Sequence, residues 1–86
     1  MNLDKLNNAS VSEAGEAMYS LLGILEDKPT EVQLLAPALL LRIMADVLRV
    51  DLQKVFTTVS NMEHNKAYGQ AQHFAAMRDY VKGELT

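Results

Sequence analysis

The sequence predicts an all-α fold, a compact bundle of four main helices with the second one central. Apolar residues recur at spacings of three and four through most of the 86 residues, as on one face of a helix. No segment shows the strict apolar–polar alternation of a half-buried strand. A chain of this length forms one domain, 1–86, and we expect its residues 1–9 to be an irregular N-terminal segment.

The first predicted helix begins near Ser10 or Ser12 and ends at about residues 26–27. Ser10 and Glu13 match the capping box, in which two side chains satisfy the free N–H groups of a helix start. The helix ends before Pro29, because proline disfavours helical geometry in the residue that precedes it. Its apolar stripe consists of Val11, Ala14, Met18, Leu21 and Leu25.

Two glycines, Gly15 and Gly23, interrupt this helix eight residues apart, so they lie within about 80° of each other around its axis. We interpret them as a flattened face where another helix crosses closely. A flexible hinge is the alternative.

The second predicted helix opens at Thr30, which forms a capping-box pattern with Gln33, and runs to about Arg49. Pro37 lies inside it, where proline removes a backbone donor and clashes with the carbonyl four residues back. We therefore expect a kink near Gln33–Pro37, or a helix that begins only near Leu35.

Asp51 is a good N-cap for the third helix. Polar residues at 61–66 indicate a loop, and the fourth helix spans about Tyr68–Lys82 with Gly83 as its stop. The stripe of the third helix consists of Leu52, Val55, Phe56, Val59 and Met62.

The composition excludes several classes of function. The chain has no cysteine and no signal-like start, so we expect a cytoplasmic protein. Its longest apolar run, Leu34–Leu41, is eight residues long, so we expect no membrane span. Its net charge is −3, without the dense basic patch of a protein that grips phosphates. We interpret the acidic first third as a solvated surface; a patch for a basic partner is the alternative.

No pattern of catalytic or metal-binding residues is present. His64 and His73 are nine residues apart, so they do not form the i, i+4 pair of a helical zinc site. The serines lack a Gly-x-Ser-x-Gly turn, and the glycines are too scattered for a phosphate loop. The sequence predicts a non-enzyme without metal, cofactor or small-molecule substrate.

The second predicted helix is unusually apolar. At 100° per residue, its apolar residues cover an arc of about 220°, whereas a surface helix typically shows about 100°. The helix must therefore be covered from two sides, either by the rest of the chain or by a partner, most simply a second copy. The charged residues Glu31, Arg42, Asp46 and Arg49 fall within about 60°, where i, i+4 and i, i+3 spacing allows Asp46 to pair with Arg42 and Arg49.

Leu35 lies beside this charged stripe, where burial within the chain explains it least well. We therefore predict a small interaction protein that binds a protein partner, itself as a homodimer, or both. The predicted interface consists of Leu35, Leu39, Arg42, Asp46 and Arg49.

An alternative is suggested by LRIMADVLRVDLQKVFTTVSNM, which resembles a helix-turn-helix. Ala45 stands where that motif needs a small residue, but Arg49 occupies the turn position that favours glycine and Thr58 a position usually aliphatic. The resemblance implies a DNA-binding transcriptional regulator that uses residues 41–61, with nucleic acid as its partner. Its DNA contacts would be Arg49, Gln53, Lys54, Thr57 and Asn61.

Residues 32–85 also resemble small all-helical proteins encoded by bacteriophages. The likeness consists of the leucine-rich helix, the RVD turn, the helix LQKVFTTVSNM and the final FAAMRDYVKGEL, without a diagnostic motif. It implies a cytoplasmic accessory, host-modulating or inhibitor protein that acts by direct contact.

Overall fold

The computed structural model describes residues 1–64 and 70–85, which form five α-helices and no strand. The all-α prediction is therefore confirmed for these residues. The helices are α1 (Leu3–Asn7), α2 (Val11–Leu25), α3 (Thr30–Leu48), α4 (Leu52–His64) and α5 (Gln70–Leu85).

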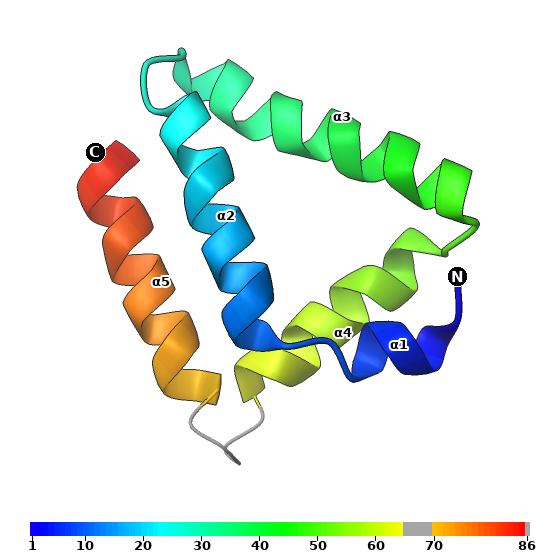
Figure 1. Ribbon diagram of the computed structural model, residues 1–86. Helices are drawn as coiled ribbons and strands as arrows, with labels where there is room; N and C mark the ends of the chain where they lie inside the picture. The colour runs from blue at the N-terminus through cyan, green and yellow to red at the C-terminus, as the bar shows by residue number, and fades with distance from the viewer. Residues whose placement is uncertain (65–69, 86) are drawn as a thin grey trace.

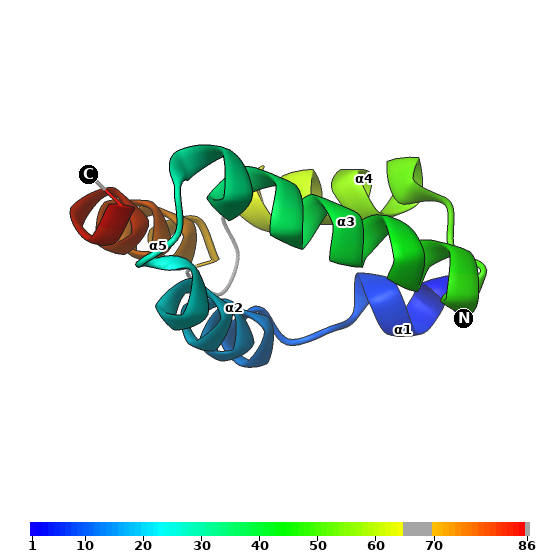
Figure 2. The same cartoon turned by 90° about the horizontal axis from the view of Figure 1, so that it is seen from above.

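Helices α2, α3 and α4 form three sides of an open frame, with α1 lying along α4 and α5 alongside α2 (Figure 1). The body is flat, with extents of 35 × 31 × 17 Å, as the view from above shows (Figure 2). Since packed helices lie 8–10 Å apart, its shortest dimension holds about two layers of helix.

The first two helices begin at side-chain caps. Asn2 accepts a hydrogen bond from the Asp4 backbone N–H at 2.8 Å, and Ser10 accepts one from Glu13 at 3.1 Å. The Ser10 cap confirms the predicted start of α2. Residues 3–7, expected to be irregular, form a short helix because Asn2 supplies the cap that a free helix start requires.

Helix α3 begins at Thr30 after Pro29, but without the predicted capping box. The side-chain amide of Gln33 instead donates to the carbonyl of Leu25 at 3.0 Å, so it satisfies the end of α2. The helix continues through Pro37, and the alternative start near Leu35 is wrong.

At the other end of the chain, Asp51 accepts from the Gln53 N–H at 2.7 Å, as predicted for the cap of α4. Residues 61–64, expected in a loop, continue α4, whereas the predicted start of the last helix at Tyr68 lies outside the described residues. Helix α5 runs through Gly83 to Leu85, so the predicted stop at Gly83 is wrong; the glycine does not adopt the left-handed conformation that ends a helix.

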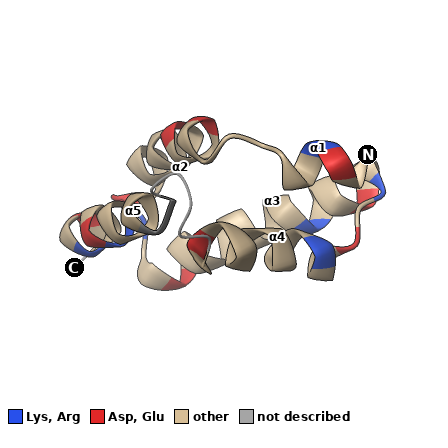
Figure 3. Ribbon diagram, turned by 90° about the horizontal axis from the view of Figure 1, so that it is seen from below, with Lys and Arg blue, Asp and Glu red and all other residues tan. Residues whose placement is uncertain are grey.

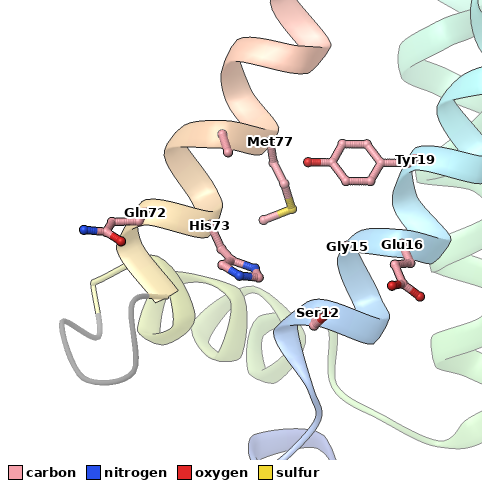
Figure 4. Close-up of a pocket in the computed structure, with 8 residues that line it drawn as sticks. Ser12, Gly15, Glu16, Tyr19, Gln72, His73 and Met77 are labelled. Atoms are coloured by element: carbon pink, nitrogen blue, oxygen red, sulfur yellow. The ribbon is translucent and has the colours of Figure 1, made fainter.

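Helices α2 and α5 pack against each other. A β-carbon at Gly15 would lie 3.2 Å from Sδ of Met77, and the Tyr19 and Tyr80 rings meet edge to face with centroids 4.8 Å apart. Figure 4 shows the side chains of Tyr19 and Met77 pointing toward one another. Gly15 therefore fits the predicted close crossing, whereas nothing lies within 4 Å of a β-carbon at Gly23.

The structure does not confirm the central position predicted for the 30–48 helix. Among the described residues, the buried positions outside α3 belong to α2 and α4, and α3 contributes only Ala45. Burial on two sides would need a helix layer on each side of α3, and a body about two layers thick does not supply them.

Candidate interaction surface

An exposed row of aliphatic side chains runs along α3 at intervals of four residues. The exposed fractions of Leu35, Leu39, Ile43 and Val47 are 61, 62, 58 and 73%. Residues four apart lie next to each other on a helix, so these side chains form one continuous ridge, here called the α3 ridge. Contiguous exposed apolar patches occur at protein–protein, membrane and ligand-binding surfaces.

A groove lies beside the α3 ridge, between α3 and the C-terminal half of α2. It has a volume of about 350 Å³, and every residue that lines it is apolar. A smaller hollow of about 130 Å³ continues it toward α1 and α4, since Leu41 and Met44 line both. The groove is lined by Leu21, Ile24, Leu25, Ala36, Pro37, Leu40, Leu41 and Met44.

Charged side chains flank the α3 ridge on its other side. Nε of Arg42 lies 3.6 Å from Oδ2 of Asp46, and both side chains are about two-thirds exposed. The predicted Arg42–Asp46 pair is therefore confirmed, whereas Arg49 makes no ion pair with Asp46 within the described residues. An exposed pair of this kind contributes about 0.3–0.5 kcal/mol to helix stability, so its importance lies in where it places charge.

Arg49 ends α3 in the left-handed conformation, at φ 56° and ψ 50°. The N–H of Val50 donates to the carbonyl of Ala45 at 2.9 Å, and the N–H of Arg49 to that of Asp46 at 3.3 Å. These two bonds form a Schellman motif, whose left-handed position is usually glycine. The position thus has the backbone geometry that favours glycine in a helix-turn-helix, and arginine occupies it.

The predicted interface residues all lie on α3 or at its end, and all five are exposed. Leu35 and Leu39 belong to the α3 ridge, Arg42 and Asp46 flank it, and Arg49 lies beyond it in the turn. Sequence reasoning missed Ile43 and Val47, which complete the ridge. The four-residue spacing after Leu35 and Leu39 was the signal that could have found them.

The residues predicted to contact DNA, from Arg49 in the turn to Asn61 on α4, are also exposed. The hydroxyl of Thr57 already donates to the Gln53 carbonyl at 2.8 Å, and Lys54 is the one lysine or arginine on α4. In Figure 3 basic segments of α1, α3 and α4 lie near one another with acidic segments among them, and further basic segments lie on α5. Nothing in this arrangement favours a phosphate-binding surface over an ordinary solvated face.

A second cavity, of about 240 Å³, lies between α2 and α5 (Figure 4). Ser12, Glu16 and His73 line it, but no hydrogen bond joins any two of them. The carboxylate of Glu16 points away from α5. A nucleophile needs a base within hydrogen-bond reach, and the residues here do not form such a pair.

Within the described ranges 1–64 and 70–85, no cluster of three or more His, Cys, Asp or Glu residues has the proximity to hold a metal ion. No helix in these ranges has the length and apolar character to cross a membrane. No family model, curated protein or solved structure matches the chain.

Proposed function

We propose that this chain is a non-enzymatic protein-interaction module that acts by direct contact through α3. The observation that carries the proposal is the α3 ridge, a row of four aliphatic side chains at intervals of four residues, each more than half exposed. Leaving such side chains in water costs about 25 cal/mol for each Å² of apolar surface, and a partner that covers them recovers this free energy.

The α3 ridge also has the layout of a protein interface. Its centre is apolar, the groove beside it is apolar, and the charges of Arg42 and Asp46 lie at its edge. Interfaces commonly combine a dehydrated apolar centre with a charged rim that remains partly solvated. A partner seated there would give α3 the central, doubly covered position that its apolar arc of about 220° predicts.

In this role the protein serves as a cytoplasmic accessory or inhibitor of the kind that its resemblance to small bacteriophage proteins implies. It needs no cofactor, because its effect comes from occupying a surface of the partner.

The test compares the parent chain with Leu39→Glu and Val47→Glu, each of which puts a charge into the α3 ridge. The matched control is Ala75→Glu, on the exposed side of α5. Each chain is immobilised and exposed to itself and to cytoplasmic extract, and bound protein is identified by mass spectrometry. We expect both ridge variants to lose the protein that the parent and the control retain, with helicity by circular dichroism unchanged.

The same four chains are then mixed with duplex DNA at low salt. A DNA shift that weakens steeply as salt is raised would overturn the proposal in favour of a DNA-binding regulator. Retention of the same proteins by the ridge variants and the parent would overturn it as well.

A further inference from the structure

We propose that the partner covering the α3 ridge is a second copy of this chain, packed α3 against α3 about a two-fold axis near Ile43. The inference rests on the proposed function and deepens it by naming the partner. The low burial of the single chain, seen in its exposed area and its thin core, supports it together with the pattern of the α3 ridge and the charges at its edge.

The exposed area of the chain is larger than a monomer of its mass needs. The accessible surface is 6631 Å², whereas a folded monomer of 9.6 kDa exposes about 5,100 Å². The excess of about 1,500 Å² per chain would bury about 3,000 Å² in a dimer, within the range of obligate homodimers. The radius of gyration, 13.6 Å, likewise exceeds the roughly 12 Å expected for 86 residues.

The core within a single chain is small. Among the described residues, the buried apolar side chains are Val11, Leu22 and Ala45, and no large side chain is less than 2% exposed. A domain of this size has little stability to spare, and a partner that covers more apolar surface would add to the burial that these residues supply. The missing apolar layer matches the face that α3 leaves open.

The α3 ridge has the geometry that lets a helix pack against a copy of itself. Its members follow one another at i, i+4, so two such ridges interdigitate when the helices cross at about −50°. No charged residue interrupts the ridge from Leu35 to Val47. The groove between α2 and α3 lies beside it and offers apolar contact to the partner as it passes.

The charges at the edge are also self-complementary. A two-fold axis near Ile43 runs the two α3 helices in opposite directions, so Leu39 of each copy lies beside Val47 of the other. The same operation places Arg42 of each copy two residues, about 3 Å along the axis, from the level of Asp46 of the other. The charged flanks of the two copies lie on the same side of the interface, so Arg42 of one copy and Asp46 of the other pair at that rim.

The first test is the mass of the parent chain in solution, measured by light scattering at micromolar concentration. We expect 19.2 kDa, twice the 9.6 kDa of one chain. The Leu39→Glu variant should shift toward 9.6 kDa, and Ala75→Glu should remain at the dimer mass. A parent mass of 9.6 kDa would overturn the inference.

The second test does not depend on a variant that weakens the dimer. The chain has no cysteine, so a single introduced thiol can form a disulfide only with the same position of another copy. Ile43→Cys lies at the proposed axis, and Ala75→Cys is the control on α5. With oxidised glutathione, we expect Ile43→Cys to form a disulfide-linked dimer quickly at dilute concentration, and Ala75→Cys at least tenfold more slowly. Equal rates would overturn the α3–α3 arrangement.

These outcomes separate the two proposals. A monomeric parent that still captures another protein through the α3 ridge rejects the second copy but keeps the interaction module. If the parent is a dimer whose mass Leu39→Glu does not change and whose Ile43→Cys variant cross-links no faster than Ala75→Cys, self-association occurs through another surface and the inference is rejected. Absence of any ridge-dependent protein contact rejects both.

Discussion

Oγ1 of Thr58 lies 2.8 Å from Oδ1 of Asn7 and joins α4 to α1 across 51 positions of sequence. Thr58 is 6% exposed, and its hydroxyl also lies 3.0 Å from the carbonyl of Lys54. One hydroxyl proton serves only one of these acceptors. Turning the Asn7 amide by 180° lets its NH₂ donate to Thr58 while the hydroxyl donates to Lys54, so that both contacts form.

Replacing Thr58 by Val keeps the shape of the side chain but removes this contact. We expect Thr58→Val to lower the free energy of unfolding by about 1 kcal/mol, the usual net value of one hydrogen bond. Urea unfolding measures it. Thr57→Val is the matched control, because Thr57 is exposed and bonds only within its own helix turn. An equal loss in the two variants would show that the contact with Asn7 contributes nothing.

Arg49 is strained by its left-handed backbone. A non-glycine residue in this region costs about 1–2 kcal/mol, and glycine relieves that cost while adding about 0.5–1 kcal/mol of unfolded-chain entropy. We expect Arg49→Gly to raise the free energy of unfolding by about 0.5–1 kcal/mol net. Arg49→Ala, which keeps the β-carbon and removes the charge, should not raise it. Thermal unfolding compares them, and equal stabilisation by both would point to charge instead of strain.

The two glycines of α2 provide a matched pair. Alanine is favoured over glycine in a helix interior by about 1 kcal/mol, and Gly23 has open space for the added methyl. We expect Gly23→Ala to stabilise the protein by nearly that amount. Gly15→Ala should stabilise the protein less, because the added β-carbon would lie 3.2 Å from Sδ of Met77 and that side chain must move away. A larger gain at Gly15, measured by urea unfolding, would contradict the close crossing of α2 and α5.

Glu26, at the end of α2, interacts with Glu84 near the end of α5. A hydrogen bond with Glu84, desolvation and the negative charges of Glu84 and Asp27 raise the pKa of Glu26 above 4.5, its ordinary value. The folded chain therefore binds a proton more tightly than the unfolded chain. The resulting stability is present at low pH and lost as the pH rises through the raised pKa.

Accordingly, Glu26→Gln should be more stable than the parent at neutral pH, and the difference should shrink as the pH falls toward 4.5. Glu84→Gln should behave alike, since it removes the same pair. Thermal unfolding over this range checks both variants. A difference that stays constant with pH would exclude the carboxyl pair as its cause.

Local signals in the sequence predicted the helices well, because a cap or a stripe depends on residues close together. The caps at Ser10 and Asp51 are of this kind. Gln33 shows where prediction from local sequence fails. Its spacing from Thr30 fits a capping box, but its side-chain amide donates to the carbonyl of Leu25 across the turn. That choice depends on where α2 ends in space, which the pattern around Gln33 does not contain.

The candidate surface was predicted in part for the same reason. Helical spacing identified the wide apolar arc and drew attention to Leu35 and Leu39. It could not tell which part of that arc the chain itself covers, so Ile43 and Val47 were not included in the predicted interface. The resemblance to bacteriophage proteins and the choice between a protein and a nucleic-acid partner stay predictions.

The weak attachment of α3 to the rest of its chain has a consequence for amide hydrogen exchange. Helices α2 and α5 support each other, so their amides should open only in large cooperative events. Hydrogen bonds join α3 to the rest of the chain near its two ends, from Gln33 to Leu25 and from the N-terminal amine to Leu48, so in a dilute chain its amides should exchange through separate, less costly openings. Raising the protein concentration should slow amide exchange in α3 selectively. The exchange rate of each α3 amide would then measure the fraction of chains whose α3 ridge is covered by a partner.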